Sequence, residues 1–214
     1  MNLKTTTLLD LTHTEHAVLF KDKKFPWEIL LALKSYVDNL TKGKTDIICG
    51  KNVVIDSQAR IEGPVVIGDN TTIGFGAYIR PYSVIGRNCI IGHATEVKHC
   101  LIFDDVVLPH FNYVGDSVVG YKVHLGGGAV LANFKTDGKN VVIVTETETI
   151  DTGLRKFGAV LGDNVEIGSG AILNPGTIIG RNTTIYAGSS IRGCISENSI
   201  VKLRQQIEIV PRHQ

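Results

Sequence analysis

An aliphatic residue recurs every six positions through most of this chain. The residue two places before it is usually small, and a glycine often follows it. Residues two apart lie on the same face of a short strand, and glycine allows the backbone to turn a corner. A period of six does not fit an α-helix and is typical of a parallel β-helix. The aliphatic series is Ile55, Ile61, Ile67, Ile73, Ile79, Ile85, Ile91, Val97, Ile102, Leu108, Val114, Val119, Leu125, Leu131, Leu161, Ile167, Leu173, Ile179, Ile185 and Ile191.

The pattern divides the chain into three parts. Residues 46–200 are predicted to form an all-β, parallel β-helix of hexapeptide repeats, in which three six-residue sides make a coil of about 18 residues. Residues 1–45 are predicted to form a helical appendage, because residues 25–40 have a proline at the start and apolar residues at helical spacing. Within residues 134–156 the repeat lapses, and an Asp-Gly turn between alternating stretches predicts an inserted hairpin arm. Residues 201–214 form a C-terminal tail.

Charge and hydropathy exclude several classes of partner. Lys and Arg number 22 against 21 Asp and Glu, so a general attraction to nucleic acid or to an anionic membrane is not expected. The sequence has no apolar run of membrane-spanning length and no signal-peptide pattern at its start. We therefore expect a cytoplasmic protein without membrane association.

Two cations are stacked by the predicted register. Arg80 and Lys98 each follow an aliphatic repeat residue one coil apart, so they should occupy the same corner of successive coils. Stacked cations at a β-helix corner would bind an anion, and phosphate is the obvious candidate. The simpler alternative is a pair of solvated surface charges, but this corner otherwise favours small residues, which points to a site.

The segment HFNYVGDS (110–117) places polar side chains where the repeat predicts small or aliphatic ones. Where the aliphatic spacing shortens by one residue, stacked positions should be 17 residues apart, which puts His110 over His93. Tyr113 and, one coil later, Asn133 should join the flank that holds the two cations. Asn112 falls in an inward slot, where a buried amide needs hydrogen-bond partners. We predict a structural role for Asn112.

A metal site is the main alternative to this arrangement. Zinc-binding β-helices such as the gamma-class carbonic anhydrases use an H-x4-H pair, and no two histidines here are five apart. His93, His99, His110 and His124 could still meet around a trimer axis, so a zinc site between subunits stays open as an alternative. No metal is expected for the reaction predicted below.

Five motifs carry a resemblance to a known family: YIRPYSVIG (78–86), EVK (96–98), HFNYVGDS (110–117), ANFKTDGKN (132–140) and GAVLGDNVEIGSG (158–170). From about Ile55 to Arg204 the chain resembles the left-handed β-helix acetyltransferase domain of the bifunctional N-acetylglucosamine-1-phosphate uridyltransferases. It is most similar to the branch with a longer loop after the Ala-Asn motif. The resemblance implies a left-handed β-helix and a homotrimer with active sites between neighbouring subunits. The expected reaction is transfer of acetyl from acetyl-CoA to an amino-sugar 1-phosphate such as glucosamine 1-phosphate, for nucleotide-sugar biosynthesis.

The resemblance also implies roles for individual residues. His110 would be the general base, oriented by Glu96. Substrate would be held by Arg80, Lys98 and Tyr113 at the phosphate and by Asn133 and Lys139 at the sugar. A backbone N–H of Gly127 would meet the acyl oxygen, and CoA would contact Ser169, Ala187 and Arg204. These residue types suit the chemistry, because a thioester is already activated and needs an aligned amine, a proton acceptor and a donor for the developing oxyanion.

Departures from the family keep other functions open. His124 stands where well-known members have an asparagine that touches the sugar, and Lys135 could replace Lys139 in the rebuilt loop. The Gly-rich nucleotidyltransferase motif L-x-G-G-x-G-T-R is absent, so we expect this chain not to make a UDP-sugar by itself. The alternative is a non-catalytic sugar-phosphate-binding or scaffolding subunit that partners a separate nucleotidyltransferase. A third possibility is a different acyl donor or acceptor on the same scaffold.

Overall fold

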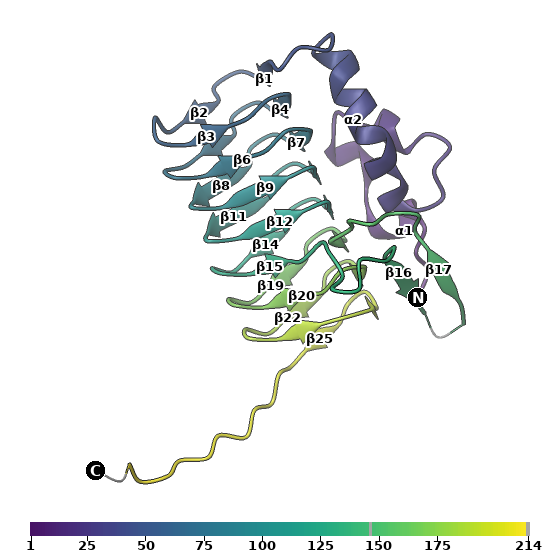
Figure 1. The fold of residues 1–214 in the computed structure, drawn as a ribbon, viewed down its shortest axis with the longest axis vertical. Helices are drawn as coiled ribbons and strands as arrows, with labels where there is room; N and C mark the ends of the chain where they lie inside the picture. The colour runs from purple at the N-terminus through teal and green to yellow at the C-terminus, as the bar shows by residue number, and fades with distance from the viewer. Residues whose placement is uncertain (146, 213–214) are drawn as a thin grey trace.

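The computed structural model describes residues 1–145 and 147–212. Three parallel sheets form the sides of a β-helix, and the chain visits them in turn (Figure 1). Sheet 1 comprises β1 (Ile47–Cys49), β4 (Val65–Ile67), β7 (Ser83–Ile85), β10 (Leu101–Ile102), β13 (Val118–Val119), β18 (Ala159–Leu161), β21 (Thr177–Ile179) and β24 (Cys194–Ile195). Sheet 2 comprises β2 (Val54–Ile55), β5 (Thr72–Ile73), β8 (Ile90–His93), β11 (Val107–His110), β14 (His124–Leu125), β19 (Glu166–Ile167), β22 (Thr184–Ile185) and β25 (Ile200–Val201). Sheet 3 comprises β3 (Arg60–Ile61), β6 (Tyr78–Ile79), β9 (Glu96–Lys98), β12 (Tyr113–Gly115), β15 (Val130–Leu131), β20 (Ile172–Leu173) and β23 (Ser190–Ile191).

The ladder confirms the predicted register. Ile67 pairs with Ile85 in sheet 1, and stacked corner asparagines are 18 residues apart. After the first shortened repeat the offset becomes 17 residues, and His110 pairs with His93 as expected. The hexapeptide prediction therefore holds residue by residue through the shortened coils.

Inward and outward positions alternate along each strand, as the pleat of a β-strand requires. In β4, Val65 and Ile67 point into the interior of the coil and belong to its continuous aliphatic core. Val66 between them faces outward and packs under the appendage. The coil thus has an internal core, and sheet 1 has a second core on its outer face.

The appendage supplies the other half of that second core. Its elements are α1 (Thr5–Leu8), η1 (Leu11–His13), η2 (Ala17–Phe20), η3 (Pro26–Glu28) and α2 (Ile29–Leu40). Four buried residues of α2, namely Ile29, Leu30, Leu33 and Val37, face sheet 1. The helix predicted for 25–40 is confirmed, with a 3-10 first turn.

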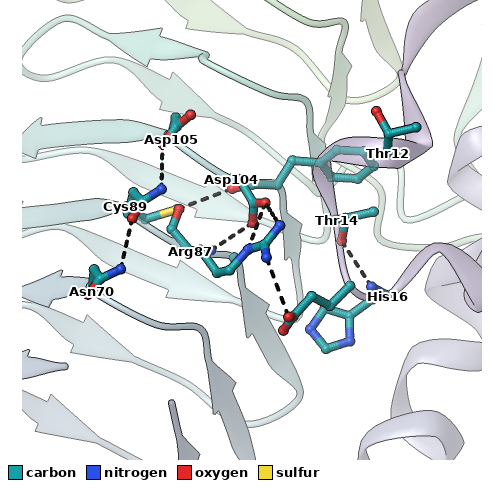
Figure 2. A network of polar contacts seen from close by, with 12 residues as sticks. Thr12, Thr14, His16, Asn70, Arg87, Cys89, Asp104 and Asp105 are labelled. Carbon is teal, nitrogen blue, oxygen red and sulfur yellow. Dashed lines mark hydrogen bonds and ion pairs between the residues drawn. The ribbon is translucent and has the colours of Figure 1, made fainter. Parts of the chain in front are cut away.

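A polar contact ties the appendage to the corner that leads from sheet 1 to sheet 2 (Figure 2). The Arg87 guanidinium lies 2.7 Å from the Asp104 carboxylate and 3.6 Å from Glu15 of the appendage. The Asp104 backbone N–H also donates to the carbonyl of His13 at 3.2 Å. Because Arg87 and Asp104 lie on adjacent coils, the contact fixes the appendage against the ladder.

The insertion forms the predicted hairpin. Strands β16 (Val142–Val144) and β17 (Thr149–Asp151) pair in antiparallel fashion, and Phe134 forms an isolated antiparallel bridge with Lys156 at the base of the arm. Ile143 of the hairpin is fully buried in the second core. The arm therefore lies on the same outer face as the appendage.

Beyond β25 the tail runs away from the last coil in an exposed, extended conformation (Figure 1). No helix among the described residues has the length and apolar character needed to cross a membrane. The division into 1–45, 46–200 and 201–214 stays a prediction.

Candidate functional site

Four of the polar residues predicted for the site lie together at the corner that leads from sheet 3 to sheet 1. Arg80, Lys98, Tyr113 and Asn133 all line one open pocket of about 850 Å³, which we call the cation pocket. Its other lining residues are Leu30, Leu31, His99, Asp116, Phe134, Leu154, Arg155 and Lys156. The parallel ladder of sheet 3 brings these residues together. Glu96, Tyr113 and Val130 pair in register on successive coils, so the residues that follow them in the chain stack at one corner.

Asp116 organises the centre of this pocket and is not among the site residues predicted from the sequence. Its side chain is only 7% exposed and lies 2.6 Å from Lys98 Nζ and 3.0 Å from His99 Nδ1. The Asn133 amide Nδ2 also donates to the same carboxylate. Burial alone would raise the pKa of Asp116, but the hydrogen bonds from His99 and Lys98 outweigh it and lower the pKa.

Gly115 makes room for two of the predicted substrate contacts. A Cβ at this position would lie 2.6 Å from both Asn133 Nδ2 and the Tyr113 hydroxyl oxygen. Such contacts are far inside van der Waals distance, so Tyr113 and Asn133 pack over bare backbone. Partial burial raises the pKa of the Tyr113 hydroxyl, which keeps it a neutral hydrogen-bond donor near neutral pH.

Glu96 lies against Arg80. The Glu96 Oε1 atom accepts a hydrogen bond from Arg80 Nη1 at 2.9 Å. Among the described residues no hydrogen bond joins Glu96 to His110. The role of Glu96 in orienting His110 therefore stays a prediction, while its contact with Arg80 was not foreseen.

The arm contributes two cations that were not predicted from the sequence. Arg155 and Lys156 line the cation pocket, whereas neither Lys139 nor its alternative Lys135 does. The Lys139 backbone N–H donates to Asp137, and Lys135 Nζ lies 3.2 Å from that same aspartate. The sequence held one indication of their position, because Arg155 and Lys156 lie just before the residues where the repeat resumes at this same corner.

His110 occupies the other end of sheet 3, at the corner that leads in from sheet 2. Its side chain is exposed and does not line the cation pocket. The Gly128 backbone N–H donates to the His110 carbonyl at 3.0 Å, and a Cβ on Gly127 would lie 3.8 Å from His110 Cβ. His110 and Gly127 are thus neighbours on successive coils, as the register predicted. At about 3.3 Å per residue, the backbone of His110 lies within ~10 Å of Tyr113.

Asn112 braces the His110 corner from inside, which confirms its predicted structural role. It is 2% exposed, and its side-chain amide donates to the Gly126 carbonyl at 2.8 Å. Its side-chain oxygen accepts from the His110 backbone N–H at 3.3 Å. The amide therefore links the backbone of His110 to the glycine-rich corner of the next coil.

A shallow groove on sheet 2 brings together two of the residues predicted to contact CoA, Ser169 and Ala187, and the predicted substrate contact His124. His124, Ser169 and Ala187 line this groove of about 330 Å³, together with Gly126. His124 Nδ1 lies 2.9 Å from Glu166 Oε2 on the adjacent strand. Arg204 does not line the groove and sits in the exposed tail, so its contact with CoA stays a prediction.

Of the four histidines weighed as zinc ligands, only His93 and His110 are neighbours within one protomer, on successive coils. His93 stacks on Phe75, His99 and His124 each face one carboxylate, and His110 is exposed. The described residues of a single chain hold no group of three histidines, cysteines or carboxylates that could bind a metal ion.

Comparison with known proteins identifies the repeat region. Residues 44–149 match the family model described as "EIF2B subunit epsilon LbH domain", in which LbH denotes a left-handed β-helix. Residues 158–193 match the model "Bacterial transferase hexapeptide (six repeats)". The predicted left-handed, hexapeptide-repeat fold is confirmed.

Two curated relatives and one solved structure are also similar to this chain. "Bifunctional protein GlmU" of Methanococcus maripaludis strain C5 is 32% identical over 120 residues, which cover 56% of this chain and 29% of that protein. "Bifunctional sugar-1-phosphate nucleotidylyltransferase/acetyltransferase" of Sulfurisphaera tokodaii is 34% identical over 110 residues, covering 51% of this chain and 27% of that protein. A solved N-acyltransferase, a point mutant of AntD from Bacillus cereus, is 20% identical with a TM-score of 0.43, covering 82% of this chain and 89% of that one. The match spans less than a third of the two curated relatives, and the predicted resemblance to bifunctional sugar-phosphate enzymes is confirmed at the level of sequence.

Proposed function

We propose that this chain is an acetyl-CoA-dependent N-acetyltransferase of an amino-sugar 1-phosphate. Its hexapeptide repeats and its sequence similarity to bifunctional sugar-phosphate nucleotidyltransferase/acetyltransferases support this proposal. The observation that carries the proposal is the cation pocket, where Arg80, Lys98, Tyr113 and Asn133 meet although they come from successive coils. A purely structural corner needs none of these side chains together. Glucosamine 1-phosphate is the acceptor to test first.

The two ends of sheet 3 divide the work of the reaction. The cation pocket binds the phosphate and the sugar at one end, and His110 stands beside Gly127 at the other. Because one short strand separates the two ends, a sugar phosphate held at the first can present its amine to the second.

Acetyl transfer then needs one proton acceptor and one hydrogen-bond donor. The amine nitrogen attacks the thioester carbonyl carbon, a new C–N bond forms, and the C–S bond breaks to release the CoA thiolate. His110 accepts the proton that the amine loses, for which an imidazole is suited near neutral pH. The Gly127 backbone N–H has no acceptor among the hydrogen bonds of the described residues, so it can donate to the oxyanion that develops on the carbonyl.

The donor would lie along sheet 2. The groove lined by His124, Ser169 and Ala187 begins on the coil that carries Gly127, on the His110 side of the molecule. We place the pantetheine arm of acetyl-CoA there, with Arg204 of the tail at its far end. His124 would contact the sugar or the donor, depending on how far each extends.

A homotrimer fits the distribution of exposed apolar side chains. The outer face of sheet 1 is covered by the appendage and the arm. In contrast, Ile90 on sheet 2 is 46% exposed, and Phe111 beside His110 is 60% exposed. Contact between sheets 2 and 3 of neighbouring subunits would cover these residues and complete the site around His110. A cytoplasmic location and a separate nucleotidyltransferase partner belong to the same proposal.

A thiol-release assay with glucosamine 1-phosphate and acetyl-CoA tests the proposal. His110→Ala should lower kcat by about 10²–10⁴-fold, as expected for loss of a general base. His13→Ala, which removes a histidine stacked on Tyr121 in the appendage, is the matched control and should leave kcat unchanged. Full activity in His110→Ala would contradict the mechanism, and no turnover by the wild type with any amino-sugar phosphate would contradict the enzymatic function.

A second function is favoured by one observation. Within one protomer Glu96 binds Arg80 and is not hydrogen-bonded to His110 among the residues described, which suits a subunit that binds sugar phosphate without catalysis. Calorimetry with CoA separates the two functions, because a scaffolding subunit should bind a sugar phosphate but not CoA. Binding of both ligands favours the acetyltransferase.

A further inference from the structure

The corner beside His110 carries a bulky side chain where other coils carry a small residue. Phe111 has a positive φ of 53° and donates its backbone N–H to the His93 carbonyl at 2.9 Å. A positive φ is unfavourable for a large side chain, because its Cβ crowds the backbone. Backbone geometry alone would therefore place a small residue here. Among the described residues, the corresponding positions with positive φ on other coils hold Gly76, Ala94, Gly128, Gly170 and Gly188.

Burial does not explain the choice of phenylalanine, since Phe111 is 60% exposed. Its ring meets the His93 ring edge-on, with the two ring centroids 4.9 Å apart and an interplanar angle of 78°. The His93 ring is itself held in place, because its Nδ1 donates to the Phe75 carbonyl at 3.0 Å. The rings of His93 and Phe111, which we call the aromatic wall, thus form a fixed surface next to the proposed general base.

The groove proposed for the acyl donor points at this wall. The ladder of sheet 2 stacks Ala187, Ser169 and Gly127 on successive coils. The next position in this column is His110, whose Cβ lies 3.8 Å from a Cβ built on Gly127, and the position after it is His93. The column thus changes from small residues to rings at the place proposed for the acyl carbonyl. An acyl chain that continues along the groove past this carbonyl meets the aromatic wall.

The spacing of the coils limits the length of that chain. One coil spacing, about 4.8 Å, separates the backbone of Gly127 from the coil that carries His110 and Phe111. An acetyl group has a single methyl beyond its carbonyl carbon and fits within this spacing. The propyl chain of a butyryl group would extend past it and clash with the Phe111 ring.

We propose that Phe111 is a specificity-determining residue, whose ring is braced by His93 and limits the acyl group of the donor to acetyl. This inference rests on the acyl transfer from CoA proposed above. It accounts for both the backbone conformation and the exposure of Phe111, because the ring contacts the acyl group of the donor rather than the interior of the fold. A hydrophobic site that is too small for one extra methylene typically discriminates by about 10–200-fold.

The experiment measures kcat/KM for acetyl-CoA, propionyl-CoA and butyryl-CoA at saturating glucosamine 1-phosphate. The test variant is Phe111→Ala, which the backbone tolerates because Ala94 has a φ of 51° at the same position on the preceding coil. The control is Phe75→Ala, which removes a ring that is 48% exposed on the same edge and leaves the carbonyl that holds His93.

The wild type should prefer acetyl-CoA over butyryl-CoA by about 100-fold or more. Phe111→Ala should reduce this preference by about tenfold or more, Phe111→Leu should reduce it less, and the control should change it by less than about twofold. A residue that only filled a contact between subunits would give a different result. Its loss would weaken assembly in sedimentation and lower the rates with all three donors alike.

An equal preference in the wild type and Phe111→Ala would overturn the proposal, as would a wild type that uses butyryl-CoA as readily as acetyl-CoA. Calorimetric titration with the same donors separates this proposal from the proposed reaction. A wild type without turnover that binds acetyl-CoA more tightly than butyryl-CoA, with the difference lost in Phe111→Ala, would refute acetyl transfer and uphold the limit on acyl size. A wild type that binds neither donor would refute both.

Discussion

Asp116→Asn tests whether one buried carboxylate holds the cation pocket together. The substitution keeps the size of the side chain and removes its charge. Lys98 would then lose the partner at 2.6 Å, and His99 would lose the acceptor at 3.0 Å. Since Lys98 is only 17% exposed, water can replace little of that interaction.

The expected loss of stability follows from this burial. Removing one member of a buried ion pair typically costs roughly 3–5 kcal/mol, because the other charge stays buried without a partner. The asparagine oxygen can still accept one hydrogen bond, so we expect about 2–3 kcal/mol here. With a urea m-value of about 2–3 kcal/mol/M, the midpoint of unfolding should fall by about 1 M.

Urea unfolding at fixed protein concentration measures the effect. Trp27 is the single tryptophan, is 1% exposed and packs near Phe157 at the base of the arm, so its fluorescence reports on this region. Asp38→Asn is the matched control, because Asp38 pairs with Lys34 on the exposed face of α2. That exposed pair should contribute less than about 0.5 kcal/mol.

The pH dependence gives an independent check. The pKa of Asp116 is lowered in the folded protein, so its contribution is fully present above the unfolded pKa of about 4 and is lost as the pH falls through the lower folded value. The difference in stability between wild type and Asp116→Asn should therefore be constant from pH 7 to about pH 5 and shrink at more acidic pH. A midpoint shift no larger than that of Asp38→Asn, or a difference that persists undiminished below the folded pKa, would refute the reasoning.

Three further substitutions test the coil and the site. Leu108→Ala removes a fully buried core side chain and should destabilise the protein by about 2–5 kcal/mol in urea, and a loss below about 1 kcal/mol would contradict its place in the core. Asn88 has a positive φ of 55° and its side chain donates to Asp105 at 3.0 Å. Asn88→Ala should therefore lower the free energy of unfolding by about 1 kcal/mol, and Asn88→Gly should lower it less. The reverse order would refute the argument from backbone conformation. Gly115→Ala should displace Tyr113 and Asn133 and raise KM for glucosamine 1-phosphate about tenfold. Calorimetry should show that the affinity for CoA is unchanged. An equal loss of affinity for the sugar phosphate and for CoA would indicate general misfolding instead.

The register of the coil was predictable because it depends on backbone pairing and on a strict period. Each inward slot must hold a residue of suitable size, so Ile67, Ile85 and Ile102 specify which strands stack. The same reasoning located Asn112, because a polar residue in an inward slot has to find partners on the next coil. Glu15 and the remaining contacts of the appendage lie outside the repeat, so no periodic signal could pair them with the coil.

The contacts made by side chains were less predictable. Glu96 has Arg80 on one neighbouring coil and the His110 corner nearby, and only the direction of its side chain selects Arg80. Asp116 could have been found, since the register that stacks Gly115 on Lys98 places the next residue beside His99. Arg155 and Lys156 follow a hairpin whose path over the coil cannot be read from hexapeptide spacing.

The two ends of sheet 3 therefore differ in how completely one chain builds them. At the cation pocket, a single protomer supplies the floor from Lys98 and Tyr113, a wall from Leu30 and Leu31 of α2, and a rim from the arm. At the His110 corner, the side chains of His110 and Phe111 are exposed on the edge of the coil, and neither the appendage nor the arm covers them. The appendage and the arm can enclose only the first end, because both pack on the outer face of sheet 1, which adjoins that corner. In the proposed trimer, a ligand phosphate would be held within one subunit and a neighbouring chain would enclose the His110 corner. Phosphate binding should then survive a dissociation of subunits that abolishes the proposed catalysis.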